Sequence, residues 1–358
     1  MSSVHRAASL DDVNTDSDLS RSVSSSAPRR VIPISPARPL PDGGRQRLRR
    51  LAQAGFFVLF VLAPVFNLLR YDLVAGHAWL LGFEWRAGLD DFSSGRIDAL
   101  GALGRILGRV LLPILAAGAL LIGVAWRWGR LYCGWLCPHF SVVETLNGLM
   151  RRASGKPSVW EPRTLPPREP DGRPVRQDAR WWLVTAPLAV GFAFVWAVVL
   201  LTYLLPPFQV YGHLLDLAPS RNEAIFILAG TVLLSIEFLF ARHLFCRYAC
   251  AVGMFQSLAW MGNKDAMVVG FERERAADCA DCYSACDHVC PMRLKPRNIK
   301  RAMFTCTQCA QCVSACETTQ QDNPAGSLLH WVAGTAARRN EAAFAPPRPV
   351  SKQERTLP

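Results

Sequence analysis

Eight of the 12 cysteines lie in one short segment, residues 279–316, where they form two closely spaced groups. Pro291 follows the first group directly. Two such groups, at least one ending in Cys-Pro, are typical of a polypeptide that binds two 4Fe–4S clusters, and the fourth cysteine of each group normally binds the other cluster. We therefore predict one cluster at Cys279, Cys282, Cys286 and Cys316, and a second at Cys290, Cys306, Cys309 and Cys312.

The first group departs from the usual spacing. Three residues, instead of two, separate Cys282 from Cys286. The additional residue would either move Cys286 out of the cluster or bulge the loop that contains it. The second group ends in Cys-Glu where the pattern has Cys-Pro.

Two other uses of these cysteines fit the spacing less well. Zinc ribbons pair two C-x-x-C knuckles across a longer spacer and do not usually carry a third and fourth cysteine so close by. A disulfide framework needs an oxidising compartment, whereas the topology described below places this segment in the cytoplasm. The pattern therefore favours iron–sulfur clusters.

The other four cysteines, here called the membrane-edge cysteines, form two pairs with i, i+4 spacing. Such spacing on a continuing helix places both thiols on one face. Thiolates are soft ligands that suit Cu(I), iron–sulfur clusters or haem iron, while the alternative is that they are small buried apolar residues. Because the spacing is repeated at two equivalent positions, we expect a redox or ligand role, with copper as one candidate metal. The pairs are Cys133 with Cys137, in YCGWLCP, and Cys246 with Cys250, in CRYAC.

The apolar residues are concentrated in long uncharged runs. Hydrophobic residues make up 51% of the 358-residue chain, and runs of this length are typical of a membrane protein. The net charge of +12 then fits cytoplasmic loops facing anionic lipid better than a nucleic-acid interface.

Four transmembrane helices are predicted, and the excess of Arg and Lys on alternate loops places both chain ends in the cytoplasm. The basic residues between 45 and 50 anchor the first span on the inner side. The proline-rich residues 154–178 are expected to form an extended cytoplasmic loop. Residues 1–50 and 334–358 are expected to be disordered tails, and residues 251–333 a cytoplasmic two-cluster domain. The predicted spans are residues 51–69, 110–126, 181–205 and 224–241.

Over residues 51–333 the chain resembles the membrane polyferredoxins of the CcoG/FixG group, which are cytochrome c oxidase accessory proteins. YCGWLCP, with Glu144 seven positions after Cys137, is similar to the first membrane motif of that group. The second motif is matched by Cys246 and Cys250, followed by FQS at 255–257 and KD at 264–265.

From the chain itself we expect a four-helix all-α membrane domain and a small cytoplasmic α+β ferredoxin-like domain. The resemblance implies a bacterial inner-membrane protein. It further implies that the protein reduces Cu(II) to Cu(I) in support of haem–copper oxidase assembly. The clusters would relay electrons from a cytoplasmic donor, the membrane-edge cysteines would contact copper, and a copper transporter or oxidase assembly factors would be partners.

Some features differ from that group. Ala251 stands where the group has a proline, and His139 where a Gln is usual. Residues 320–358 are too few for the further span and immunoglobulin-like domain that the group commonly has.

Two alternative functions stay open. The neighbouring NapH-type ferredoxins pass electrons from quinol to periplasmic reductases, and they have four spans and no additional domain. The other alternative is a non-catalytic assembly scaffold whose clusters are structural. No glycine-rich strand-to-helix turn is evident, so a nicotinamide or flavin would have to be bound by a partner.

Overall fold

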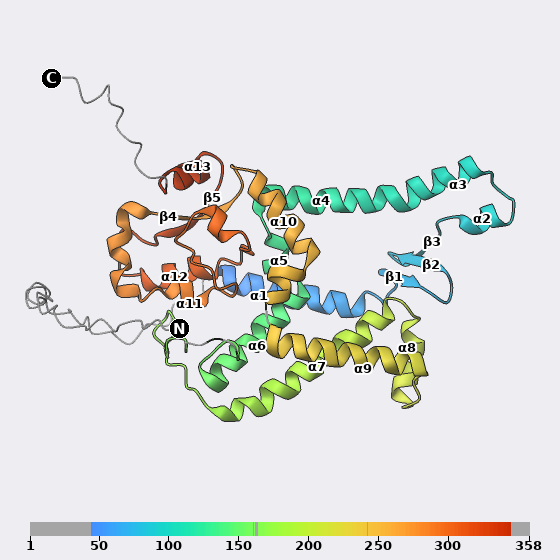
Figure 1. Ribbon diagram of the computed structural model, residues 1–358, viewed down its shortest axis with the longest axis horizontal. Helices are drawn as coiled ribbons and strands as arrows, with labels where there is room; N and C mark the ends of the chain where they lie inside the picture. Colours follow the sequence, from blue (N-terminus) through green and yellow to red (C-terminus); the bar gives the residue numbers. More distant parts are fainter. Residues whose placement is uncertain (1–43, 160, 162–163, 242, 345–358) are drawn as a thin grey trace, which may run out of the picture. The chain divides into compact units, whose positions relative to one another are not determined.

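The computed structural model describes residues 44–159, 161, 164–241 and 243–344, and most of them are helical (Figure 1). Most of the predicted N-terminal tail (residues 1–43) and the last part of the predicted C-terminal tail (residues 345–358) lie outside the described residues. Residues 44–50 are not a tail, because they form the first turns of helix α1 (Gly44–Leu62). Helix α13 (Thr335–Ala342) likewise occupies part of the expected C-terminal tail.

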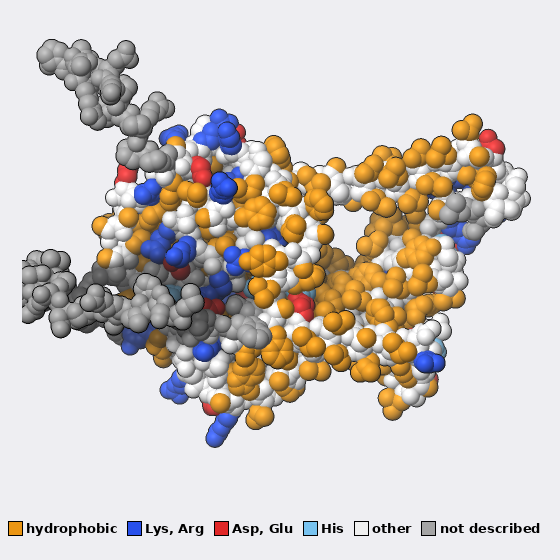
Figure 2. Space-filling model, in the orientation of Figure 1, with side chains coloured by type: hydrophobic (Ala, Val, Ile, Leu, Met, Phe, Trp, Pro, Cys, Tyr) orange, Lys and Arg blue, Asp and Glu red, His pale blue; other side chains and the backbone are white. Residues whose placement is uncertain are grey.

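Three helical stretches are long and apolar enough to cross a membrane, and their apolar side chains cover the surface over α3, α4, α7 and α9 (Figure 2). They are Ala99–Trp128, Ala179–Thr202 and Arg221–Ala241. The first consists of α3 (Ala99–Ile106), the π-helical η1 (Leu107–Leu111) and α4 (Leu112–Trp128), so it begins well before the predicted span of residues 110–126. The second consists of η2 (Ala179–Trp181) and α7 (Trp182–Thr202), and the third of α9 (Arg221–Ile236) and the π-helical η3 (Glu237–Ala241).

The first predicted span is not among these three, so the expected count of four is not confirmed. Helix α1 ends at Leu62, before Pro64, and does not continue to residue 69. Its first two turns contain four arginines, which leaves residues 51–62 as its apolar part. At 1.5 Å per residue this part is roughly 18 Å long, short of the ~30 Å thickness of a bilayer core.

The two halves of α1 pack against different neighbours. In the C-terminal half, the rings of Phe57 and Phe60 lie 6.0 and 4.8 Å from that of Trp196 on α7. The N-terminal half contacts α5 (Leu131–Trp135) and α6 (Pro138–Ser154). Helix α1 therefore connects the membrane helices to the part of the chain that contains the cysteines.

The loop after α1, predicted to be external, forms a three-stranded antiparallel sheet of β1 (Leu69–Asp72), β2 (His77–Leu80) and β3 (Phe83–Trp85). The amides of Tyr71 and Leu73 donate to the carbonyls of Tyr203 and Leu204, both at 2.9 Å. These bonds fasten the sheet to the end of α7. Helix α2 (Leu89–Ser93) leads on to α3, and α8 (Pro207–Leu215) follows α7.

The proline-rich loop is irregular, as predicted. In its described residues between 155 and 178 there is neither a helix nor a named strand. The amide of Asp178 donates to the carbonyl of Arg152 at 2.9 Å, and the Arg152 guanidinium lies 5.3 Å from the Trp181 ring centroid. The loop therefore returns the chain from the end of α6 to the start of α7.

The cysteine-rich segment folds into a small α+β unit, as expected. Strands β4 (Val268–Phe271) and β5 (Leu329–Val332) pair antiparallel, and α12 (Gln311–Thr319) packs against β5 and against α11 (Ala285–Val289). Two short 3-10 helices, η5 (Arg273–Cys282) and η6 (Lys300–Met303), complete the unit. Lys and Arg side chains gather over this part of the protein (Figure 2).

Because α7 packs closely against α9, the stability of the protein should depend on side-chain size at their contact. A Cβ atom added at Gly230 on α9 would lie 3.1 Å from the Cβ atom of Ala197 on α7, and small residues let membrane helices approach closely. Gly230→Leu should therefore lower the stability by about 1–3 kcal/mol, measured as a lower thermal midpoint in mild detergent. Gly123→Leu on α4, where a Cβ atom meets no neighbour within 4 Å, is the control. Equal midpoints for the two variants would contradict this packing.

Candidate iron–sulfur site

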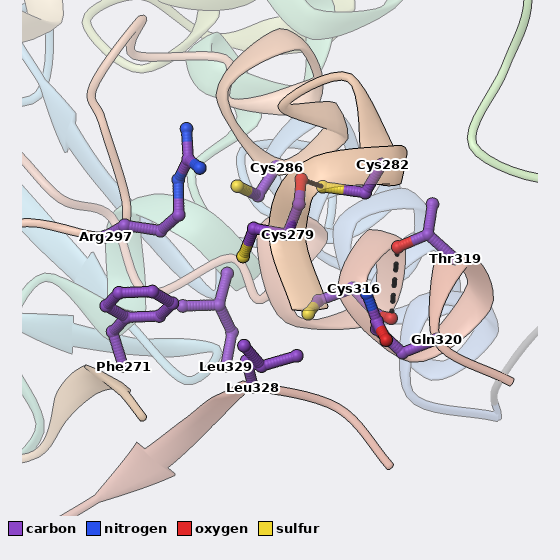
Figure 3. Close-up of a pocket in the computed structure, with 10 residues that line it drawn as sticks. All are labelled: Phe271, Cys279, Cys282, Cys286, Arg297, Cys316, Thr319, Gln320, Leu328 and Leu329. Atoms are coloured by element: carbon purple, nitrogen blue, oxygen red, sulfur yellow. Dashed lines mark hydrogen bonds between the residues drawn. The ribbon is translucent and has the colours of Figure 1, made fainter. Parts of the chain in front are cut away.

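Four cysteines from three elements surround one cavity, here called cavity 1 (Figure 3). It has about 260 Å³ of empty space. Phe271 and Leu329 form part of its apolar wall, and Arg297 lies at its edge. The Sγ atom of Cys282 donates to the carbonyl oxygen of Cys279 at 3.3 Å. The four cysteines are those grouped by spacing, Cys279, Cys282, Cys286 and Cys316, and their binding of a cluster stays a prediction.

The additional residue before Cys286 forms a bulge. Tyr283 and Ser284 have φ values of 47° and 56°, and two successive left-handed residues are uncommon outside strained functional loops. Helix α11 begins directly after them. Cys286 consequently lines cavity 1 and is not displaced from it.

The other four cysteines of the segment surround cavity 2, with about 330 Å³ of empty space. Its loops turn through Gln308 and Ala310, with φ values of 53° and 57°. The Leu294 amide donates to a cysteine sulfur here at 3.4 Å, the kind of hydrogen bond that stabilises and tunes a cluster. The four, Cys290, Cys306, Cys309 and Cys312, are the second group predicted from spacing, and their role also stays a prediction.

The donor sets fit clusters better than single ions. Within the described residues, no three His, Cys, Asp or Glu side chains are arranged to hold one metal ion. A structural zinc needs four ligands at about 2.0–2.3 Å from one point, whereas a 4Fe–4S cluster takes one thiolate at each of its irons and so requires wider spacing. Four thiols around each cavity match the second requirement.

Burial raises the pKa of Cys286, Cys290 and Cys306 to about 12. Because a thiol must lose its proton to bind iron, nearby cations and amides favour binding. At cavity 1, burial and Asp287 raise the pKa of Cys286 while Arg297 lowers it. The Arg297 guanidinium also donates to Asp287 at 3.0 Å, so a carboxylate balances part of its charge.

Each pair of membrane-edge cysteines lies at a break between two helices. Cys133 lies in α5 and Cys246 in the π-helical η4 (Phe245–Ala249). Cys137 and Cys250 cap the next helices, α6 and α10 (Ala251–Gly262), with ψ values of 117° and 106°. The expectation that each pair lies on one continuing helix is therefore wrong, because the backbone leaves the helical conformation at the second cysteine.

The membrane-edge thiols nevertheless converge. Burial raises the pKa of Cys246, and the other three thiols raise it further, which requires them to lie near it. The Cys133 Sγ donates to Gln256 Oε1 at 3.2 Å, and the Cys246 Sγ lies 3.4 Å from His139 Nδ1. On its other side, His139 Nε2 contacts the carboxylate of Glu237 at 2.8 Å, so Glu237 is partnered within the protein.

The membrane-edge cysteines lie against cavity 2. Cys137 and Cys246 belong to the same buried cluster of side chains as Cys290 and Cys306. Gly134 makes this approach possible, because a Cβ atom there would lie 2.2 Å from the carbonyl oxygen of Thr307. The adjacent Trp135 Nε1 donates to the carbonyl of Gln308 at 3.0 Å. The two sets of cysteines, far apart in sequence, thus share one interior.

A buried polar network holds this contact in place. Arg49 on α1, 1% exposed, donates from both terminal nitrogens to Glu144 on α6, with Nη1 at 2.9 Å, and from Nη1 to the carbonyl of Gly134 at 3.2 Å. Gln53 donates to the same carbonyl and to Glu144, both at 3.2 Å, and Gln311 of α12 also donates to Glu144. Burial would lower the pKa of Arg49, but Glu144 reverses this and raises it.

Sequence reasoning missed three arginines of the site. Arg49 is among the basic residues predicted to anchor the first span on the inner side, yet it pairs with Glu144. Arg130 and Arg297 have no predicted role in the site. An acidic residue in the first membrane motif indicates that a basic partner lies nearby, but which arginine supplies it depends on the tertiary fold.

A family model described as a 4Fe–4S binding domain matches residues 110–157 and 223–265. These two stretches contain the membrane-edge cysteines together with the helices on either side of them. The match supports iron–sulfur chemistry for this protein. No solved structure gives a significant match.

The chain is similar to curated electron-transport proteins. It is 28% identical over 211 residues to the putative electron transport protein YccM of Escherichia coli K12, a match that covers 57% of this chain and 55% of YccM. It is 26% identical over 279 residues to the ferredoxin-type protein NapH of the same organism, covering 75% and 85%. NapH of Haemophilus influenzae is 22% identical, covering 75% and 85%.

These similarities identify an iron–sulfur electron-transfer protein of the membrane, related to NapH and YccM. The more specific resemblance to the CcoG/FixG group stays a prediction, and copper reduction gains no support from these relatives.

The two ion pairs of α1, one buried and one exposed, should contribute different amounts to the free energy of unfolding. Glu144→Gln would leave a buried cation without its counter-charge and should lower the free energy of unfolding by about 3 kcal/mol. The Arg45–Glu317 pair, with side chains 35% and 42% exposed, is the control, and Glu317→Gln should cost no more than ~1 kcal/mol. Urea titration in mild detergent measures both. A loss for Glu144→Gln no larger than for Glu317→Gln would contradict a structural role for the buried pair.

Proposed function

We propose that this protein is a membrane-bound electron relay that accepts electrons from quinol and passes them, through two 4Fe–4S clusters, to a partner reductase. The observation that carries the proposal is the shared interior of the membrane-edge cysteines and cavity 2. A soluble ferredoxin has no need of four thiols held between its cluster and the ends of apolar helices. The similarity to NapH and YccM supports the same class of function.

The residues of the chain would have distinct tasks in this relay. A bound 4Fe–4S cluster supplies one-electron transfer at a potential set by its surroundings. Five of the eight cysteines around the two cavities are buried, and most of the eight pack among apolar side chains. Gly134 and Thr307 bring the membrane-edge cysteines against cavity 2. The polar network at Glu144 holds the membrane-edge cysteines in place against the cysteine-rich unit.

We place both chain ends on the cytoplasmic side, with an inner-membrane location. The Arg45 side chain at the start of α1 pairs with Glu317 on α12 at 3.1 Å, which puts α1's first turn on the same side as the cysteine-rich unit. The excess of Arg and Lys in the loops supports the cytoplasm as that side. This placement suits thiols that must stay reduced to bind iron.

Copper reduction is the second candidate, and the similarity to YccM and NapH favours it less, because these relatives are described as an electron transport protein and a ferredoxin-type protein.

Stopped-flow reduction under anaerobic conditions tests the proposal. Protein loaded with clusters and placed in lipid nanodiscs is mixed with a reduced quinol, and bleaching of the iron–sulfur absorbance is recorded. We expect rapid reduction of the wild type and at least about tenfold slower reduction of the Cys133→Ser/Cys137→Ser variant, equivalent to ~1.4 kcal/mol in the barrier. Dithionite should reduce both proteins fully, which controls for cluster content.

Equal quinol rates in the two proteins would contradict a role for the membrane-edge cysteines in electron entry. Failure of quinol to reduce the wild type, with formation of Cu(I) when Cu(II) is added to the reduced protein, would favour copper reduction instead.

A further inference from the structure

Arg130 is a fully buried cation between the two sets of cysteines. Its side chain is 1% exposed, and its Nη2 atom donates to the carbonyl oxygen of Cys246 at 2.8 Å. Its Nε atom has no hydrogen-bond partner within the described residues, where no carboxylate pairs with the guanidinium either. Burying a cation without a counter-charge costs several kcal/mol, so this position calls for an anionic group nearby.

The surrounding chain is shaped to hold the guanidinium. A Cβ atom at Gly253 of α10 would lie 2.2 Å from Arg130 Nη2, so a larger residue there would displace the guanidinium. Gly129, with φ of 72°, ends α4 and turns the chain directly before Arg130. A Cβ atom at Gly129 would also lie 3.3 Å from the Gln308 side chain of cavity 2. Two glycines therefore place this arginine where α4, α10 and cavity 2 meet.

Thiols of both sets lie near Arg130. Its hydrogen bond to the backbone of Cys246 places it against a membrane-edge cysteine. Cys246 belongs to the same buried cluster of side chains as Cys290 and Cys306, which line cavity 2. One guanidinium is thus close to both sets of cysteines. Thiolates, alone or bound to iron, would supply the counter-charge that Arg130 otherwise lacks.

We propose that Arg130 is a positioning residue that supplies the positive charge shared by cavity 2 and the membrane-edge cysteines, and that it raises the reduction potential of the cluster in cavity 2. Reduction adds one negative charge to a cluster, and a buried cation stabilises the more negative state. The inference rests on the proposed function, because a higher potential brings the cluster nearer to the range in which quinol donates electrons.

The two cavities provide an internal comparison. Arg297 at cavity 1 shares its charge with Asp287, and Arg49, which donates to the carbonyl of Gly134, is paired with Glu144. Arg130 has no such partner in the described structure. Loss of the charge of Arg130 should therefore change the potential of the cluster in cavity 2 and leave the cluster in cavity 1 nearly unchanged.

Redox titration followed by EPR, on full-length protein purified without oxygen, tests this inference. For Arg130→Gln we expect the ratio of reduced to oxidised cluster in cavity 2, at the wild-type midpoint, to fall about tenfold, which is ~59 mV for a one-electron couple. Arg130→Lys should retain a potential close to that of the wild type. Arg127→Gln, which removes a charge whose guanidinium donates to the Asp265 carbonyl in an exposed hydrogen bond at 3.5 Å, is the matched control and should show no shift.

Each outcome is decisive. If Arg130→Gln loses the cluster of cavity 2 while Arg130→Lys keeps it, the positive charge is required and the inference holds. An unshifted potential in a fully loaded Arg130→Gln protein would overturn it, as would loss of the cluster in both variants or an equal shift of both clusters. Wild-type protein without cluster signals would instead refute the proposed function.

Discussion

The arrangement of this protein depends on one close backbone contact, that of Gly134 with Thr307. No side chain fits between them, so the loop after the first long apolar helix can touch the loop of cavity 2. The contact places Cys137 and Cys306 in one interior. Backbone contact alone would leave polar groups of both loops without partners, and Arg49 and Trp135 satisfy two of their carbonyls. The shared interior, and the function we infer from it, both follow from this approach.

Arginine side chains lie beside the buried thiols of the site. Burial makes the thiols of Cys286, Cys290, Cys306, Cys309 and Cys312 harder to ionise, yet iron binding requires thiolates. Arginines from separate parts of the chain lie beside the cavities, and two of them, Arg49 and Arg297, are balanced by carboxylates. The third, Arg130, is balanced by none in the described structure, which makes its position the most informative electrostatic feature of the site. A fold that keeps such a charge buried is suited to holding an electron there.

Much of the site could be predicted from the sequence, because cysteine spacing is a local property. The grouping of the cysteines around two cavities agrees with the spacing, and the bulge at Tyr283 and Ser284 explains how the irregular group reaches cavity 1. Long-range features were less accessible. The arginines of α1 were predicted only to anchor the first span on the inner side. Their partners, Glu144 and Glu317, are distant in sequence and reach them only in the tertiary fold. The i, i+4 pairs suggested continuous helices, but spacing cannot reveal a break at the second cysteine.

The most direct test of this account is the iron and acid-labile sulfide content of protein purified without oxygen, measured together with its EPR spectrum after reduction. Two clusters require about eight iron and eight sulfide per chain, and two neighbouring reduced clusters give signals broadened by their spin coupling. That stoichiometry with a coupled spectrum is the result we predict. A single zinc ion at each cysteine group, about four iron per chain, or two signals without coupling would contradict the account.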